Sequence, residues 1–480
     1  MSTTFTEANY ENSIIELFEN MGYQHVYGPD IERDFYSPLY NDVLIEYIHS
    51  LNPSLPEEAV SDAMYKLQNY EAGDIVQKNE VFMDYLQHGI PVRYTAGGEQ
   101  CSSLAYIVDY KNIDNNSFII ANQWTFVENS NKRPDIVLFV NGLPLVLVEL
   151  KSPSREETDA SEGYTQIRNY IHEIPSMFIY NCICVISDHL TSKAGTITSD
   201  EDRFMEWKTK DGNYENTQHA QFDTFFEGMF DKTRLLDIIK NFICFSNEGL
   251  EKYKILAGYH QYFAVKKAVE MAKKAVNTDG KGGVFWHTQG SGKSLSMVFY
   301  AHLLQEALDS PTIVVITDRN DLDGQLYDTF CSAYEFLRQE PIKCESRADV
   351  REILEGRKTG GVIFSTIQKF VEETGLLSDR ENIVVMVDEA HRTQYNIDGK
   401  LDTNTGEIKY GYAKYLRESL PNATYIAFTG TPIETTDKST YGVFGDLIDV
   451  YDMTQAVEDG ATVKIYYESR LAKVKLDRHQ

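Results

Sequence analysis

The sequence predicts an α/β protein of two main domains, and three observations support this fold class. A chain of 480 residues is too long for one hydrophobic core and suits two or three domains. Residues 118–186 contain short runs rich in Val, Ile and Phe, which are typical of strands, with one helical stretch before the last run. From about residue 255, short apolar runs alternate with helical stretches and end at polar turns. This second pattern is typical of a doubly wound parallel sheet with its chemistry at the carboxyl ends of the strands.

The first domain is expected to begin with an amphipathic helix over residues 7–21, in which apolar residues recur at helical spacing before Gly22. Strand, strand, strand, helix and strand should follow, at residues 118–121, 136–140, 145–150, 158–172 and 179–186. Residues 194–220 are polar and rich in Gly, Thr, Asp and Asn, so we expect them to form a surface excursion.

The second domain is expected to contain a parallel sheet. Five apolar runs predict its strands, at residues 283–286, 313–316, 362–364, 383–387 and 425–428. We place the boundary between the domains near 240–255. The domains are then residues 1–245 and 246–460, with residues 461–480 as the start of a link to a further domain.

Bulk composition limits the class of protein. The chain is 42% hydrophobic and 25% charged, as in ordinary globular proteins. No apolar run approaches the roughly 20 residues that span a bilayer, and the first residues lack the features of a signal peptide. We therefore expect a cytoplasmic protein without a membrane segment. Six cysteines without a CxxC pair favour reduced thiols over disulfides or a zinc site.

The net charge of −28 argues against a lone high-affinity DNA binder, because DNA binding draws on Lys and Arg. Residues 1–92 carry three basic residues against sixteen acidic ones, a balance of −13, and should not contact DNA. Basic residues nearer to the strands at 136–150 are better placed to do so, namely Lys111, Lys132, Arg133, Lys151, Arg155 and Arg168. An acidic chain of this kind is expected to depend on a partner to hold its DNA.

Three residues around these strands match the PD-(D/E)xK pattern of metal-dependent nucleases. Asp135 precedes one strand, and Glu149 and Lys151 are two residues apart near the end of the other, so their side chains leave the same face. Two carboxylates can gather Mg²⁺, which activates water and stabilises charge on the scissile phosphate. Lys151 can position the water or neutralise developing charge. As charges beside apolar strands, Asp135 and Glu149 would be costly unless a metal or a partner neutralised them.

A regular two-residue hairpin would place the two carboxylates on opposite faces of the sheet. The Asn-Gly dipeptide at 141–142 favours such a turn, which would pair Asp135 with Val148. A metal site therefore requires a loop of three or five residues, or a bulge, so that Asp135 lies opposite Glu149. Pro144 makes a tight regular turn less favourable, because it cannot donate a ladder hydrogen bond.

Additional residues are candidates for the same site. Gln166 and Tyr170 form a QxxxY pair on one face of the predicted helix, as in RecB-family nucleases. Glu11 could supply a further metal ligand from the first helix, and the alternative is a solvated surface glutamate. Glu80 is a second candidate for that ligand.

A phosphate-binding loop follows the first predicted strand of the second domain. Its residues are Thr288, Gln289, Gly290, Ser291, Gly292, Lys293 and Ser294. The glycines let backbone N–H groups close on phosphate, Lys293 supplies positive charge to the β and γ phosphates of ATP, and Ser294 coordinates Mg²⁺. His287 stands where a standard loop of this kind has Gly or Ala.

A second motif, residues 388–391 (Asp-Glu-Ala-His), directly follows the apolar run at 383–387. Asp388 would hold Mg²⁺ through water, and Glu389 would orient and deprotonate the attacking water. A chance Gly-rich turn could explain the phosphate loop alone, but not both motifs in this order.

Further segments fit the same ATPase. Residues 429–432 (Thr-Gly-Thr-Pro) could couple nucleotide state to nucleic acid, and residues 317–320 and 365–368 follow strands where loops that contact the nucleic-acid backbone would lie. Gln261 lies where an adenine-reading glutamine would be, and the alternative is a surface helix residue. Together these segments resemble the first motor domain of superfamily 2 helicases and translocases, over about residues 255–440.

The order of both sites resembles the HsdR restriction subunit of type I restriction-modification systems. The matching segments are residues 118–123, 133–135, 148–151, 286–294 and 388–391. In this family His287 is the usual residue, and residues 459–468 look like the link toward a second motor domain. The resemblance implies a RecB-like nuclease domain followed by a RecA-like motor domain. It also implies partner specificity and methyltransferase subunits that recognise an unmethylated site, while ATP drives double-stranded DNA past the complex and the nuclease cuts at a distance.

One further expectation depends on this resemblance. The second RecA-like domain, with its arginine finger, would lie after about residue 470, so we expect these 480 residues to bind ATP but hydrolyse it poorly or not at all. One alternative is a type III restriction subunit, whose nuclease follows the motor, or another superfamily 2 helicase-nuclease. A DEAH-type RNA helicase would leave Asp135, Glu149 and Lys151 unexplained, and the last alternative is a non-catalytic ATP-binding scaffold. Intact Lys293 and Glu389, with the three nuclease residues, disfavour the scaffold.

Overall fold

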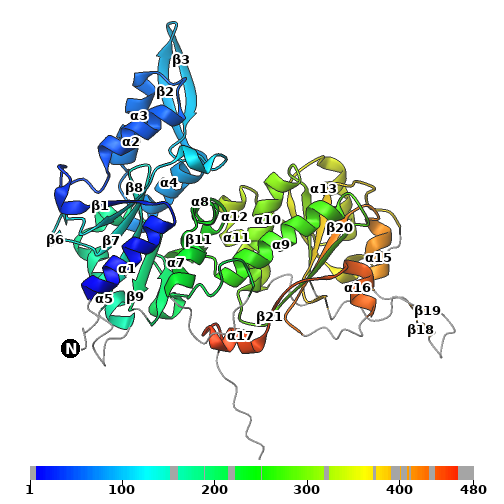
Figure 1. The fold of residues 1–480 in the computed structure, drawn as a ribbon. Helices are drawn as coiled ribbons and strands as arrows, with labels where there is room; N and C mark the ends of the chain where they lie inside the picture. The colour runs from blue at the N-terminus through cyan, green and yellow to red at the C-terminus, as the bar shows by residue number, and fades with distance from the viewer. Residues whose placement is uncertain are drawn as a thin grey trace, which may run out of the picture.

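The computed structural model contains two main β-sheets flanked by helices (Figure 1). A six-stranded sheet is formed by residues 24–195 and a seven-stranded sheet by residues 281–451. The predicted α/β class, with the parallel sheet in the second domain, is therefore confirmed. The described residues are 7–151, 160–188, 190–213, 222–249, 251–317, 324–370, 375–390, 400–401, 408–409, 412–431 and 438–462. Within these ranges no helix has the length and apolar character needed to cross a membrane.

The first sheet has the order β1-β4-β7-β8-β9-β10. Its strands are β1 (Gln24–Tyr27), β4 (Phe118–Asn122), β7 (Ile136–Val140), β8 (Leu143–Leu150), β9 (Ile183–Ser187) and β10 (Ser192–Gly195). Strands β4, β7 and β8 are antiparallel neighbours, whereas β9 runs parallel to β8. The three strands predicted between 118 and 150 are confirmed, but the strand predicted at 179–186 begins only at Ile183.

Two helices around this sheet lie where the sequence predicts them. They are α1 (Glu7–Asn20) and α5 (Ala160–Glu173). The hydroxyl groups of Tyr10 and Ser187 lie 2.6 Å apart, which holds α1 against the end of β9. Helix α5 packs on β8 and β9. The remaining helices of this half are α2 (Asn41–Leu51), α3 (Glu57–Gln68), α4 (Ile75–His88), α6 (Pro175–Phe178), α7 (Phe222–Phe230) and α8 (Lys232–Asn241).

A segment inserted between β1 and β4 stands out from the first sheet (Figure 1). It includes α2, α3 and the hairpin of β2 (Ile90–Ala96) and β3 (Glu99–Ala105), which is a separate two-stranded sheet. Helix α3 packs along β2. Three shorter pairs complete the strands: β5 (Phe126–Val127) with β6 (Asn131–Lys132), β11 (Ile243–Glu248) with β12 (Glu251–Leu256), and β18 (Lys400–Leu401) with β19 (Ile408–Lys409).

The second sheet is entirely parallel, with the order β15-β16-β14-β17-β20-β13-β21. Its strands are β13 (Lys281–His287), β14 (Thr312–Thr317), β15 (Pro341–Lys343), β16 (Val362–Thr366), β17 (Ile383–Val387), β20 (Thr424–Thr429) and β21 (Leu447–Tyr451). Its helices are α9 (Tyr259–Ala275), α10 (Lys293–Ala307), α11 (Gln325–Ser332), α12 (Tyr334–Leu337), α13 (Arg347–Gly356), α15 (Tyr412–Ser419), α16 (Lys438–Phe444) and α17 (Met453–Glu458). All five predicted strands lie in this sheet.

The two halves share one continuous hydrophobic core. Phe242 packs against Tyr262 of α9 and Phe299 of α10, with ring centroids 4.7 and 5.5 Å apart. The expected surface excursion at 194–220 is wrong for its described part, residues 194–213. Trp207 is 2% exposed because it packs against α9, where Tyr262 and Phe263 contact its ring. Composition alone suggested a loop, but aromatic residues within this polar segment bind it to the second domain.

Candidate metal and phosphate-binding sites

A bulge in the β7–β8 hairpin decides where the two acidic side chains of the PD-(D/E)xK pattern lie. The turn at 141–142 has two residues, with φ values of 51° and 81°, as a type I′ turn requires. The ladder pairs Phe139 with Pro144, but then pairs Leu138 with Val146. The extra residue on β8 is Leu145, and it shifts the register by one.

This shift aligns the carboxylates. Because Ile136 pairs with Val148, the next positions, Asp135 and Glu149, fall opposite each other on one face. The backbone N–H of Leu150 donates to Oδ2 of Asp135 at 2.7 Å. A two-residue turn combined with a bulge therefore provides the alignment that the metal-site hypothesis required.

Burial makes both carboxylates costly as anions. It raises the pKa of Asp135 to about 8, and the neighbouring negative charge of Glu149 adds to this shift. Burial also raises the pKa of Glu149, against the opposing effect of Lys151. Lys151 Nζ donates to Oε1 of Glu149 at 2.6 Å. The other oxygen, Oε2, is buried and has no hydrogen-bond partner among the described residues.

The QxxxY pair lies beside the same carboxylate. Burial and then Glu149 raise the pKa of Tyr170, and a hydrogen bond with Gln166 opposes the shift. The structure thus brings together Asp135, Glu149, Lys151, Gln166 and Tyr170, from two strands and helix α5.

The two acidic candidates outside the motif lie in different places. Both oxygens of Glu11 accept side-chain amide hydrogen bonds at the end of β4, from Asn122 at 2.6 Å and Gln123 at 3.1 Å. Glu80 is remote from this network and pairs with Lys252 of β12. Glu7 was missed in the sequence, although it lies one helical turn before Glu11. Its charge contributes to raising the pKa values of Asp135 and Glu149.

These residues fit a Mg²⁺ site with few protein ligands. Mg²⁺ is usually held by one or two carboxylates and completes its shell with water and substrate phosphate. The described residues contain no group of three or more His, Cys, Asp or Glu side chains arranged as a metal cage. Asp135 and Glu149 are paired carboxylates, and one oxygen of Glu149 is buried without a partner among the described residues. They therefore match a Mg²⁺ site with two protein ligands rather than a cage of three or more.

The phosphate loop joins β13 to α10, and Gly292 at the helix N-terminus has a φ of 76°. Ser294 lies in the first helical turn and is partly exposed. Lys293 Nζ is 2.9 Å from Oε1 of Glu389, which follows β17. The ion pair joins the two ATPase motifs directly.

A third motif meets them at the carboxyl ends of adjacent strands. Gly430 follows β20, the neighbour of both β13 and β17. A Cβ atom on Gly430 would lie 3.2 Å from Lys293 Nζ and 3.2 Å from Gln289 Cγ. Thr288, Asp388 and Thr431 lie in the same three loops, whereas residues 318–320, 391 and 432 fall outside the described ranges.

Gln261 contacts the phosphate loop rather than projecting from a surface helix. It is 4% exposed, and its Nε2 donates to the carbonyl of Gly292 at 3.0 Å. Its Oε1 accepts the N–H of Gly258 at 2.9 Å. His260 supports the loop in the same way, with Nε2 3.0 Å from the carbonyl of Ser291.

A polar network connects this loop to the first domain, and no sequence pattern predicts it. His260 stacks on Tyr451 at 4.1 Å between ring centroids. Tyr451 and Tyr259 donate to Oδ2 of Asp459, at 2.7 and 2.6 Å. The other oxygen of Asp459 lies 2.6 Å from Nζ of Lys208, which is 5% exposed. A residue of the first domain therefore reaches the support of the phosphate loop.

His287, the unusual residue before the loop, is fully buried. Its Nε2 lies 3.1 Å from Oδ2 of Asp449, whose Oδ1 accepts from Lys267 at 2.7 Å. Burial lowers the pKa of His287, although Asp449 opposes this shift. His287 and Lys267 together contact both oxygens of a buried carboxylate under the loop.

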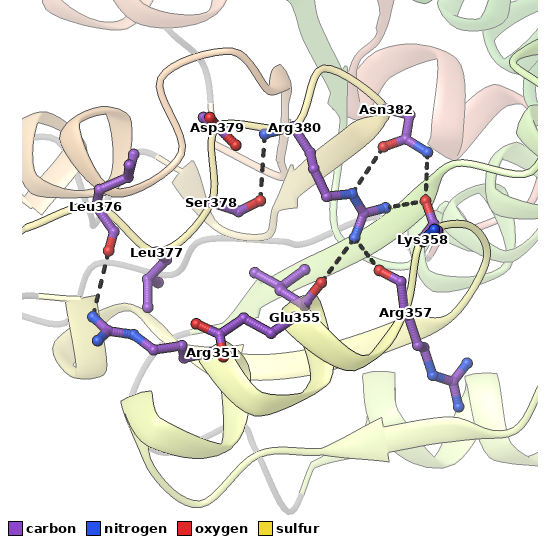
Figure 2. Close-up of a pocket in the computed structure, with 11 residues that line it drawn as sticks. Arg351, Glu355, Arg357, Lys358, Leu376, Leu377, Ser378, Asp379, Arg380 and Asn382 are labelled. Carbon is purple, nitrogen blue, oxygen red and sulfur yellow. Dashed lines mark hydrogen bonds between the residues drawn. The ribbon is translucent and has the colours of Figure 1, made fainter.

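A pocket of about 630 Å³ lies at the opposite, amino-terminal ends of the strands and belongs to neither site. Figure 2 shows Arg380 at its wall, where the guanidinium donates to the backbone carbonyls of Arg357 and Lys358. It also donates to the carbonyl of Leu354 at 3.2 Å. Asn382 accepts a further bond at 3.0 Å. With its donors engaged in this way, Arg380 fastens the start of β17 to the loop before β16.

The fold and sites define a class of protein in which an α/β domain with paired carboxylates precedes a superfamily 2 type ATPase domain. Two family models match the chain: the type I restriction enzyme R protein N terminus at residues 4–203, and the SWI2/SNF2 ATPase at residues 260–480. The chain belongs to the family of type I restriction enzyme endonuclease (HsdR) subunits.

Curated relatives agree with this assignment. The chain is 40% identical to the type I restriction enzyme HindI endonuclease subunit of Haemophilus influenzae, over 96% of this chain and 46% of that protein. It is 35% identical to a subunit assigned to the MjaIXP enzyme of Methanocaldococcus jannaschii, over 97% and 46%. A solved fragment assigned to an HsdR subunit of Vibrio vulnificus YJ016 has 16% identity and a TM-score of 0.28, covering 71% of this chain and 56% of that one. The chain thus spans about half the length of the curated relatives.

Proposed function

We propose that this chain carries the nuclease and the first motor domain of a type I restriction subunit. In this proposal, ATP-dependent translocation of double-stranded DNA is coupled to Mg²⁺-dependent cleavage away from the recognition site. The observation that carries it is the bulge at Leu145, which sets Asp135 opposite Glu149 beside Lys151. A separate phosphate loop on the same chain supplies the motor.

In the nuclease site, Mg²⁺ would activate water and stabilise charge on the scissile phosphate. Asp135 and Glu149 would hold the ion, and its charge would offset their cost as buried anions. Lys151 would then turn from Glu149 toward the phosphate oxygens. Tyr170, with Gln166 beside it, would orient the Glu149 side chain from α5.

In the ATP site, the ion pair between Lys293 and Glu389 has to open. Lys293 would then contact the β and γ phosphates of ATP, while Ser294 and Asp388 would hold the accompanying Mg²⁺. Glu389 would be released to orient the attacking water. Gln261 and His260 would keep the loop in shape through the carbonyls of Gly292 and Ser291.

The charge of the chain supports a partner-dependent mode of DNA binding. Two basic residues expected near DNA are engaged within the protein: Lys132 pairs with Glu173 at 2.7 Å, and Arg168 donates to the carbonyl of Ile197 at 2.9 Å. With a net charge of −28, specificity and methyltransferase subunits would hold the DNA and recognise the unmethylated site.

A type III restriction subunit and a non-catalytic scaffold explain fewer of the observed features. In a type III subunit the nuclease would follow the motor, which is the reverse of the order here. A non-catalytic ATP-binding scaffold would not need Asp135 and Glu149 as a costly buried pair.

Cleavage of an unmethylated circular plasmid tests the proposal. The assay combines the full-length subunit with its modification partners, Mg²⁺ and ATP, and compares Lys151→Ala and Lys293→Ala. We expect ATP-dependent cleavage that both substitutions abolish. Cleavage that survives Lys151→Ala would place the nuclease elsewhere, and cleavage without ATP would leave the motor without its proposed role.

A further inference from the structure

The β2–β3 hairpin has one edge that the protein covers and one that it leaves open. On β2 the outward-facing backbone groups are engaged by α3: Arg93 N donates to Asp62 at 2.9 Å and Thr95 N donates to Glu58 at 2.9 Å. Pro91 has no N–H, and its carbonyl accepts from Lys66. The edge of β2 is therefore closed to further pairing.

The register identifies the matching groups on β3. Arg93 pairs with Ser102, Thr95 with Gln100 and Pro91 with Leu104. Since the N–H groups of Arg93 and Thr95 point away from β3, these pairs are the non-hydrogen-bonded ones, and their partners also point outward. The outward backbone groups thus belong to Gln100, Ser102 and Leu104.

No described residue hydrogen-bonds these outward backbone groups of β3. Beyond them, Asn52 closes the edge at Tyr106, donating to its carbonyl and accepting its N–H. Edge strands are usually protected by Lys, Pro or a bulge, and β3 has none of these. The result is an uncapped edge on a hairpin that stands out from the molecule (Figure 1).

The charge and the exposed apolar residues around this edge indicate which kind of partner could bind it. Residues 40–106 contain ten acidic and three basic residues, a balance of −7, which excludes nucleic acid and favours a basic protein segment. Leu104 and Tyr106 are 42% and 49% exposed and provide an apolar contact surface at one end of the β3 edge.

We propose that the free edge of β3, at Gln100, Ser102 and Leu104, binds an extended, basic segment of a partner protein by β-augmentation. Backbone hydrogen bonds would supply the affinity, and a side chain beside Leu104 would supply an apolar contact. The inference rests on the proposed function, because the partner is taken to be one of the modification subunits.

Hydrogen exchange in the assembled complex tests this proposal. The probe is the purified methyltransferase–specificity complex of the same system, mixed with the full-length subunit. We expect the amides of Ser102 and Leu104 to exchange at least tenfold more slowly in the complex. We also expect Ser102→Pro, which removes an outward N–H without touching the β2 ladder, to weaken assembly at least tenfold. Ser102→Ala keeps that N–H and is the matched control.

The outcomes separate this inference from the proposed function. If the complex forms but the β3 amides stay unprotected, the inference fails and the function stands. If Ser102→Pro and Ser102→Ala assemble equally well with the partners, the inference also fails and the proposed function stands. If light scattering shows that the wild-type subunit does not assemble with these partners at all, both fail. Protection that appears through self-association, without the partner complex, would overturn the proposed occupant.

Discussion

Asp135 is a carboxyl group whose folded environment disfavours its charge. Its pKa is raised from 3.8 to about 8, so between these values the folded chain binds more protons than the unfolded chain. The metal-free protein should therefore lose stability as pH rises through this window.

We predict that Asp135→Asn stabilises the metal-free protein, on the order of 2 kcal/mol at pH 8 and less at pH 5. Thermal unfolding in EDTA at the two pH values measures the effect. Asp114→Asn, at an exposed carboxylate of the same domain, controls for the loss of one charge. An equal or lower midpoint for Asp135→Asn at pH 8 would contradict the assigned environment.

In the proposed ATP site, Glu389 would compete with nucleotide for Lys293. We predict that Glu389→Gln binds ATP several-fold more tightly, because the 2.9 Å ion pair no longer has to be broken, and that hydrolysis by the full-length subunit is lost. Equilibrium titration with a fluorescent ATP analogue measures the affinity. Glu381→Gln, at an exposed position before the same strand, is the control. Weaker binding by Glu389→Gln would show that the ion pair is not the competitor.

At the scale of elements, the turn at 141–142 fixes the register of β7 and β8. Gly142 has a φ of 81°, and an added Cβ would lie 2.5 Å from the carbonyl oxygen of Tyr40 and 2.7 Å from the backbone nitrogen of Leu44. We predict that Gly142→Ala costs about 2–4 kcal/mol and weakens metal binding. Gly97→Ala is the matched control: its φ is 61°, but its Cβ meets nothing within 4 Å, so it should cost only about 1 kcal/mol. Calorimetric midpoints that fall equally for both would contradict this.

Element positions were predictable where the period of apolar residues was clear, as in β4, β7, β17 and β20. The bulge was predicted only as a requirement of the site. Its place at Leu145 was not predicted. Pro144 was expected to disfavour a tight turn, and this is wrong, because the turn at 141–142 has two residues and Pro144 pairs with Phe139 in the ladder. Glu7 could have been found from its spacing to Glu11 along α1. The burial of Trp207 was not predicted, because the polar composition of residues 194–220 outweighs the few aromatic residues that pack against the second domain.

At the scale of the whole molecule, Lys208 and Asp459 meet across 251 positions of sequence, so no local pattern could predict their contact. We predict that Lys208→Met lowers ATP affinity several-fold, although Lys208 lies behind the loop, because the loss of its charge loosens Asp459, Tyr451 and His260. Lys210→Met is the control, since Lys210 pairs within the first domain with Asp223 and Glu227. Unchanged ATP affinity in Lys208→Met would show that the network does not support the loop.

The central claim is that the bulged hairpin forms a metal site. The most direct test is a titration of the nucleotide-free protein with Mn²⁺, used as a spectroscopic substitute for Mg²⁺, followed by electron paramagnetic resonance. We predict that the wild-type protein binds Mn²⁺ and that Asp135→Asn loses this binding, while Lys293→Ala retains it. Equal binding by wild type and Asp135→Asn would contradict the claim.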